Sequence, residues 1–458
     1  MKRFAFSKII YLYALLLILL FKQTNSFCQN TTIRPVEDIF KVMEIVSGKN
    51  DNPLWPDFRV SEIPMLVYDS VNSWLFYSKV SPDGFKEVKE HQGVYIYNGQ
   101  HPLVRGNSIV RAGDLWMATS VLSSHALRTG EKYSAEDLAG IIIHEQFHIF
   151  LKNNHPRWQP NDGYLLLYPA ETQEALFLRR IEKEAFKRAV LSEKPGEITG
   201  WVKEALNYRE RRLNMIYPVF RRYEMELQRT EGLSDYIEKV ARGLDPLNAS
   251  NITSGIAPSG IRDLGYVEGR WIAMILDKLN PRWKTVLEEN DTLYLENILK
   301  NVVSELPLEA KGFTTTEIDK LKTEASTDFN NWQSRKKREI EEFDNMPGFR
   351  IEINASSKPL TFRIFEPLEI EILDDGSVYH RLIFSAGNGN GTMRIMNQPC
   401  ITWFDNSLKI NKVALNGLKE SPLVNEKENK VVIRNNNISI ELKYSRMIIN
   451  GSLYVFEL

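Results

Sequence analysis

The chain has 458 residues, a formal net charge of −1, 43% hydrophobic residues, seven histidines and two cysteines. The length exceeds what one ordinary hydrophobic core serves, so two or three domains are expected, and the composition is far from that of a disordered protein. The charge near zero gives no reason to expect a nucleic-acid partner, and two cysteines exclude a disulfide-rich scaffold and a four-thiolate zinc site.

The N-terminus has the pattern of an export signal. Lysine and arginine follow the initial methionine, and a mostly apolar run extends from Ile9 to Phe21. This run has about the length of a signal-peptide core and is short for a membrane span. We therefore predict a signal peptide over residues 1–28, cleaved after Cys28, and no membrane span in the mature chain. The alternative is a short anchor helix that is not cleaved.

Cleavage would leave Cys400 as the remaining thiol, so no intramolecular disulfide is available. An exported protein without disulfides fits a bacterial periplasm or exterior better than a eukaryotic secretory route. We therefore expect an exported protein that is periplasmic, attached to the cell surface or secreted.

The next part of the chain, to about residue 130, has a mixed pattern. Apolar residues at helical spacing predict a helix over Val36–Val46, and short apolar runs predict strands. The strand near Val110 to Trp116 could present its edge to an extended peptide. The predicted strands cover residues 64–68, 74–77, 94–97 and 115–117.

The pattern is mainly helical from residue 134 to residue 345, and it then changes. Pro347 and Gly348 form a break, beyond which short segments alternate apolar and polar residues between regularly spaced turns. Such alternation is typical of an all-β sandwich. The predicted helices cover residues 134–152, 171–192, 198–243, 264–279 and 316–344.

The first of these helices contains the motif His-Glu-x-x-His. His144 and His148 stand four residues apart and share one helical face, so both imidazoles can reach one metal ion. Glu145 is offset by about 100° around the helix and can accept a proton from metal-bound water. Ser134 and Asp137 predict a capping box at the start of the helix. The alternative is that the motif is a coincidence and that His144 and His148 are ordinary core residues. Burying two imidazoles and a carboxylate in an apolar helix, however, costs free energy unless they have polar partners.

A catalytic zinc usually takes three protein ligands and leaves one position for water. His155 would lie about 10 Å along the helix from His148, which makes it a poor third ligand. A carboxylate is the better candidate, and Glu231 on a helix of about 216–243 is the best one. Gly232 beside it would let this helix pack close to the His144 helix. The rival carboxylates are Glu171, Glu174, Glu182 and Glu184.

Asp235 lies four residues after Glu231, so both carboxylates share one helical face. If one of them ligates the zinc, the other could accept a hydrogen bond from the free ring nitrogen of a ligand histidine and fix its tautomer. The alternative is a solvated acidic face.

The segment His144–His148 and the later segment Glu231–Asp235 together resemble the pattern of the gluzincin metallopeptidases, of which thermolysin is the archetype. The resemblance covers about residues 135–280, and it implies that His144, His148 and Glu231 bind Zn²⁺, that Glu145 is the base and that Asp235 orients His144. The 83 positions from His148 to Glu231 exceed the thermolysin spacing. The Glu-Gly-Leu-Ser-Asp-Tyr segment is more similar to membrane- and surface-associated relatives.

With this resemblance the expected fold class is α+β. A zincin-like catalytic domain over residues 29–345, with a mixed sheet before its helical part, precedes a β-sandwich-like accessory domain over 346–458. The expected function is an exported zinc peptidase acting on peptide or protein substrates, with zinc-bound water activated by Glu145. Tyr266 is the candidate oxyanion donor, with Arg262 and Arg270 as rivals and core packing as the alternative role.

A second class of function is an envelope binding protein with a structural zinc site. In that case the β domain would bind another protein or a glycan. The presence of Glu145 beside the histidines argues against this alternative, because a structural zinc site normally closes its fourth position.

Overall fold

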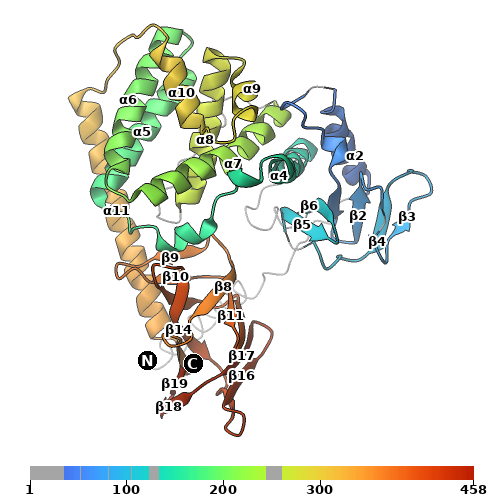
Figure 1. The fold of residues 1–458 in the computed structure, drawn as a ribbon, viewed down its shortest axis with the longest axis vertical. Coiled ribbons are helices and arrows are strands. Elements are labelled where there is room, and N and C mark those ends of the chain that lie inside the picture. The colour runs from blue at the N-terminus through green and yellow to red at the C-terminus, as the bar shows by residue number, and fades with distance from the viewer. Residues whose placement is uncertain (1–35, 52, 81, 105, 123–133, 244–259) are drawn as a thin grey trace, which may run out of the picture. The chain divides into compact units, whose positions relative to one another are not determined.

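The computed structural model describes residues 36–51, 53–80, 82–104, 106–122, 134–243 and 260–458 (Figure 1). The predicted signal peptide lies outside these residues. No helix in the described part of the chain is long and apolar enough to cross a membrane. The described residues form two compact units, one made of those between 36 and 53 and between Asp57 and Ile149, the other of Leu54–Pro56 and those between Phe150 and Leu458.

The first unit contains a six-stranded mixed sheet. Its strand order is β3-β4-β2-β1-β6-β5, and β1 and β6 are parallel while the other pairs are antiparallel. The single strand expected near Val110 to Trp116 is instead a hairpin, in which β5 at one edge of the sheet turns at residues 113–114 into β6. The elements are α2 Val36–Gly48, the short 3₁₀ helix η1 Val60–Glu62, β1 Met65–Tyr68, β2 Asn72–Phe76, β3 Lys86–Glu87, β4 Tyr95–Asn98, β5 Ser108–Ala112, β6 Leu115–Val121 and α4 Ala135–Asn154, of which the residues from Phe150 onward belong to the second unit.

Helices make up the first part of the second unit. Residues 198–243 were expected to be helical, with the helix that carries Glu231 covering about 216–243, and the structure has two helices here with a break before Pro218. Proline lacks the N–H that a continuous helix requires but is well placed at the first position of the next one. The elements are η2 Pro156–Trp158, η3 Asp162–Leu167, α5 Gln173–Leu191, α6 Pro195–Leu213, α7 Pro218–Arg242, α8 Gly260–Leu279, α9 Trp283–Glu288, α10 Leu295–Ser304 and α11 Thr315–Asp344.

Strands alone form the C-terminal part, as predicted. They join in a single 13-stranded sheet, mainly antiparallel, in which β19 and β7 are parallel, so the expected pair of separate sheets is not formed. The strands are β7 Phe349–Asn354, β8 Leu360–Phe365, β9 Ile370–Ile372, β10 Val378–His380, β11 Ile383–Asn388, β12 Gly391–Met396, β13 Cys400–Phe404, β14 Lys409–Leu418, β15 Leu423–Asn425, β16 Lys430–Arg434, β17 Ile438–Lys443, β18 Arg446–Asn450 and β19 Leu453–Glu457.

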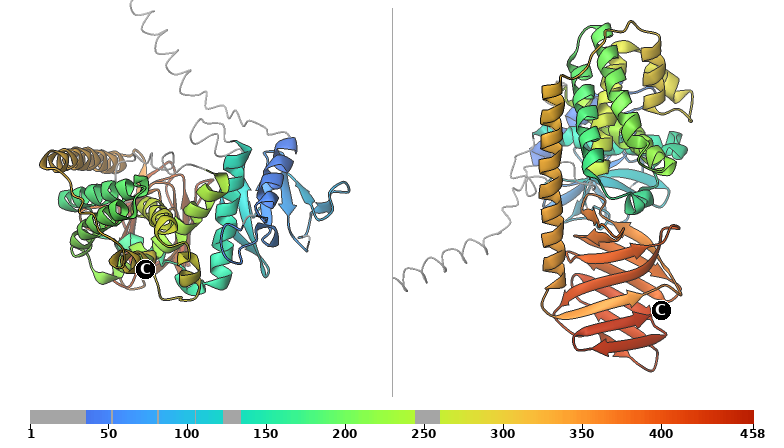
Figure 2. Two further views of the ribbon diagram at one scale, coloured as in Figure 1. Left: turned by 90° about the horizontal axis from the view of Figure 1, so that it is seen from above. Right: turned by 90° about the vertical axis from the view of Figure 1, so that its left-hand side faces the viewer.

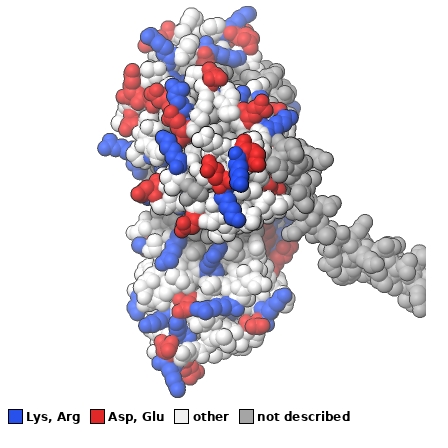
Figure 3. Space-filling view, turned by 90° about the vertical axis from the view of Figure 1, so that its right-hand side faces the viewer, with Lys and Arg blue, Asp and Glu red and all other residues white. Residues whose placement is uncertain are grey.

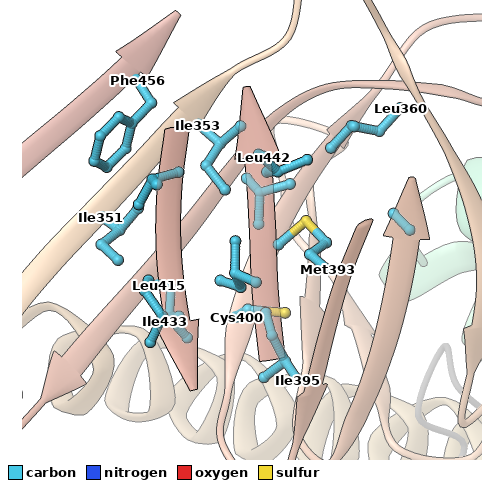
Figure 4. Close-up of a cluster of buried hydrophobic side chains, with 14 of the residues drawn as sticks. Ile351, Ile353, Leu360, Met393, Ile395, Cys400, Leu415, Ile433, Leu442 and Phe456 are labelled. Atoms are coloured by element: carbon cyan, nitrogen blue, oxygen red, sulfur yellow. The ribbon is translucent and has the colours of Figure 1, made fainter. Parts of the chain in front are cut away.

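This sheet encloses its own core. Leu442 on β17 belongs to the same buried cluster as Ile351 on β7 and Phe456 on β19, although β17 is far in the strand order from the paired strands β7 and β19 (Figure 4). The sheet therefore bends back on itself, and bulges in the pairing of β8, β13 and β7 with their neighbours permit the bend. Cys400 is a free cysteine and is buried in this core.

The helical part and the β part pack together within the second unit. Phe220 and Leu227 of α7 share a buried cluster with Ile370 and Ile372 of β9. Helix α11 runs beside both parts (Figure 2, right), and the indole N–H of Trp332 on it donates to Glu371 of β9 over 2.7 Å. The change from helices to strands falls between α11 and β7, close to the expected domain boundary at residue 345. The division into a catalytic and an accessory domain stays a prediction.

Charge is distributed differently on the surface and inside the helical part. On the face drawn in Figure 3, basic and acidic side chains are interspersed. Inside, Arg209 and Arg212 of α6 are buried and ion-paired: Arg209 contacts Glu182 and Glu268 at 2.6 and 2.7 Å, and Arg212 contacts Glu224 at 2.8 Å. Buried charges are stable only when paired in this way, so the network holds α5, α6, α7 and α8 together.

Candidate metal centre

Helix α4 carries the two histidines, and its start is capped as predicted. The Ser134 N–H donates to Asp137 Oδ2 over 3.0 Å, and the Asp137 N–H donates to Ser134 Oγ over 3.1 Å. Farther along, Gln146 donates two hydrogen bonds from its side-chain amide, to the carbonyl oxygens of Val60 and Ile63 at 2.9 and 2.7 Å. These bonds fix the rotation of α4 about its axis, so the histidines are directed away from the contact with η1.

The two imidazoles converge through the same type of nitrogen. His144 Nε2 and His148 Nε2 are 3.1 Å apart, close to the ~3.3 Å between two nitrogens that bind one tetrahedral zinc ion at about 2.05 Å. His144 is buried, whereas His148 and Glu145 are half-buried. The helix therefore presents two ligand atoms and a partly accessible carboxylate within one turn.

Glu231 lies on α7, where α8 determines its surroundings. Arg262 of α8 donates a hydrogen bond to Glu231 Oε1 and another, over 2.7 Å, to Asp162 Oδ1 of η3. The hydroxyl of Tyr223 also donates to Asp162 Oδ1, over 3.1 Å. Burial by itself lowers the pKa of Arg262, but Glu231, Asp162 and Tyr266 raise it well above its usual range, so the guanidinium stays charged.

One ligand atom each from His144, His148 and Glu231 lies within 4.8 Å of the other two, so this group could hold a metal ion. Two imidazoles and one carboxylate match the donor set of many catalytic zinc sites, although the donor atoms alone do not identify the ion. The structure thus brings together the three residues that the sequence motifs selected.

The remaining candidates lie on α7 and α8. Asp235 Oδ2 accepts a hydrogen bond from Arg270, and Lys239 lies 3.4 Å from Asp235 Oδ1. Tyr266 is half-buried on α8, one helical turn after Arg262 and one turn before Arg270, so the three oxyanion candidates share one helical face. The orientation of His144 by Asp235 and the role of Tyr266 both stay predictions.

Gly232 packs against a different helix from the one expected. A Cβ atom at this position would lie 2.5 Å from the Cα of Gly269 and 2.7 Å from the carbonyl oxygen of Gly265, both on α8. The expectation that Gly232 makes room for the His144 helix is therefore corrected: its nearest neighbours belong to α8. The close crossing of α7 and α8 explains how Arg262 and Arg270 reach the two carboxylates of α7.

The rejected ligand candidates have other partners. His155 is held through both ring nitrogens, by Glu288 at 2.8 Å and Asp291 at 3.0 Å. The rival carboxylates form ion pairs with arginines: Glu171 with Arg179, Glu174 with Arg211, Glu182 with Arg209 and Arg212, and Glu184 with Arg188.

Asp162 and Tyr223 did not emerge from the sequence. Asp162 lies in a short 3₁₀ helix, far from both motifs along the chain, and neither residue stands at a ligand-like spacing. Only the packing of η3 against α7 and α8 places them beside Arg262.

Comparisons with known proteins identify no relative of this chain. No family model, no curated protein and no solved structure matches it. The two short motifs and the donor atoms that the structure groups together are therefore the observations that bear on function.

Proposed function

We propose that this protein is an exported zinc-dependent peptidase of the gluzincin type, in which His144, His148 and Glu231 bind the zinc ion and Glu145 is the general base. The observation that carries the proposal is the grouping of the three ligand atoms within 4.8 Å. Two of them come from a motif on α4, and the third was selected on a helix far along the chain. If His144 and His148 were only core residues, nothing would require the Glu231 carboxylate to lie beside them.

The chemistry follows from the residues. Zinc bound there supplies Lewis acidity, which lowers the pKa of a bound water to about 7 and polarises the scissile carbonyl. The Glu145 carboxylate accepts a proton from the attacking water, whose oxygen bonds to the carbonyl carbon. Glu145 then gives this proton to the amide nitrogen as the C–N bond breaks. Tyr266 is the proposed hydrogen-bond donor to the negatively charged oxygen that develops on the substrate.

The decisive experiment separates zinc binding from hydrolysis. Glu145→Gln is expected to retain about one zinc ion per chain, because the glutamate is not a ligand, but to lose roughly 10²–10⁴-fold in peptide hydrolysis. Zinc is measured by mass spectrometry, and activity with a fluorogenic peptide library. Glu136→Gln, an exposed glutamate in the first turn of the same helix, is the matched control and should keep full activity.

Two results would contradict the proposal. Full activity in Glu145→Gln would exclude the general-base role. A wild-type protein that holds one zinc ion but hydrolyses no peptide of the library would favour the binding-protein alternative.

The third ligand has its own test. Glu231→Ala removes the proposed carboxylate ligand, so zinc content is expected to fall well below one ion per chain after dialysis against a weak chelator. Glu226→Ala is the control, because Glu226 lies on the same helix but pairs with Arg222 at 3.6 Å and is not in the group of candidate ligands. Unchanged zinc in Glu231→Ala would exclude Glu231 as a ligand.

A further inference from the structure

A second binding site is suggested by a cavity in the C-terminal part of the second unit. It has a volume of about 1110 Å³ and lies between the last turns of α11 and the sheet surface formed by β7, β13 and β14. Residues 373–377, which connect β9 and β10, and the β18–β19 turn also line it. Small-molecule sites usually occupy about 300–1,000 Å³, so the cavity has room for a ligand of several rings.

The cavity combines an apolar base with one immobilised aromatic side chain. Ile401 and Ala414 line it and belong to a buried cluster against which Trp403 packs. Trp403 is half-buried; its indole N–H donates to Asp375 Oδ2 over 3.2 Å, and the Lys412 ammonium lies 5.0 Å from the ring centroid. The indole is thus held in place before any ligand arrives.

The charges around the cavity compensate one another. Lys412 pairs with Glu352 at 2.7 Å, Lys336 with Asp374, and Lys337 with Glu341 at 3.8 Å. Such a lining offers many hydrogen-bond donors and acceptors but little net attraction for a phosphate or another strongly charged group.

A peptide backbone also fits this surface poorly. An extended peptide usually binds by adding a strand to a free sheet edge. Here β13 pairs with β10 on one side and with β14 on the other. Strand β14 in turn pairs with β13, β7 and β8, so neither β13 nor β14 has a free edge. A ligand that lies against β13 and β14 is therefore recognised by side chains on a sheet face.

We propose that this cavity binds a neutral oligosaccharide, with Trp403 as the surface on which a sugar ring stacks. A pyranose ring presents C–H bonds on its faces, which suit an indole, and hydroxyls around its rim, each of which both donates and accepts. These properties match an aromatic side chain that lines a cavity together with paired charges. The inference does not depend on the peptidase proposal.

The test uses the full chain and a panel of neutral hexasaccharides built from glucose, mannose, xylose or N-acetylglucosamine. Isothermal calorimetry is expected to detect binding of at least one of them, and Trp403→Ala should weaken that binding by about tenfold or more. Trp201→Ala is the matched control, because Trp201 is also half-buried with a cation, Arg188, over its ring, but lies on α6. Circular dichroism verifies that both variants are folded.

The proposal is overturned if the wild-type chain binds no member of the panel, or if folded Trp403→Ala binds as tightly as the wild type. Binding should be the same with and without a chelator that removes zinc. This comparison distinguishes failure of the saccharide site from failure of the proposed metal site.

Discussion

Arg262 of α8 donates a hydrogen bond to the carboxylate of Glu231 on α7, and eight residues farther along α8 Arg270 does the same for Asp235. The two carboxylates selected from the sequence are therefore each held by an arginine of the neighbouring helix. A carboxylate held in this way has one preferred orientation, which matters if it is to bind a metal ion with defined geometry.

The first prediction concerns the hydrogen bond from Arg262 to Glu231. Arg262→Met keeps an unbranched side chain but removes the hydrogen bond to Glu231, so we expect zinc affinity to fall by about 10–100-fold, the usual effect of losing a residue that orients a ligand. Competition with a fluorescent zinc chelator measures the affinity. Arg221→Met is the control, because Arg221 makes a two-nitrogen contact with Glu210 elsewhere. Tighter zinc binding in Arg262→Met would show instead that the arginine charge competes with the metal.

The second prediction concerns Tyr266. Tyr266→Phe removes only the hydroxyl, and if this group stabilises charge that develops during the reaction, kcat should fall by about 10²-fold while KM stays nearly constant. Steady-state kinetics on a fluorogenic peptide distinguish the two constants. Tyr164→Phe, at another half-buried tyrosine, should leave both unchanged. An unaltered kcat in Tyr266→Phe would limit this residue to packing.

The third prediction concerns the crossing of α7 and α8. Gly232→Ala would place a methyl group against the backbone of α8, at 2.5 Å from Gly269 Cα, and backbone cannot move aside as a flexible side chain can. We expect a loss of about 3 kcal/mol or more in the free energy of unfolding, measured by urea denaturation. At Gly196 of α6 the nearest atom would be 3.6 Å away, so Gly196→Ala should be neutral or stabilise by up to about 1 kcal/mol. Equal stabilities would refute a close helix crossing.

The fourth prediction concerns the pH dependence of stability through Glu268. Burial, together with the nearby Glu182, raises the pKa of Glu268 from 4.5 to about 7, although Arg209 lowers it. The folded chain thus binds this proton more tightly than the unfolded chain. The contribution of this bound proton to the free energy of unfolding is complete below pH 4.5 and is lost as the pH rises through 7. Relative to Glu268→Gln, wild-type unfolding free energy should decrease over this range by at most about 1.4 kcal/mol per pH unit.

Glu317→Gln is the control for this experiment. Hydrogen bonds from the Thr314 N–H, from Arg188 and from the Thr314 hydroxyl lower the pKa of Glu317 to about 2. Because Glu317 does not titrate between pH 5 and 8 and is not among the charges that shift the pKa of Glu268, its variant should differ from the wild type by a constant amount over that range. A Glu268→Gln difference that is equally constant would contradict the raised pKa.

Local patterns predicted the elements well where neighbouring residues determine them. The α4 helix could be predicted with its cap, because Ser134 and Asp137 satisfy its first N–H groups through contacts three residues apart. The helix that carries Glu231 was expected to cover about 216–243 and covers Pro218–Arg242, where proline occupies the first helical position. The short helices α9 and α10 were also missed, because short helices depend on tertiary packing more than on their own sequence.

By itself, the sequence determined the ligand types and their local geometry, because a spacing of four residues on a helix places two imidazoles on one face whatever surrounds it. It also selected Glu231 among several carboxylates. Only the tertiary structure decided that Gly232 faces α8, that Arg262 holds Glu231, and that Asp162 and Tyr223 stand behind Arg262. The physical reason is that these contacts join segments far apart along the chain, and no periodicity in a sequence encodes which helix faces will meet.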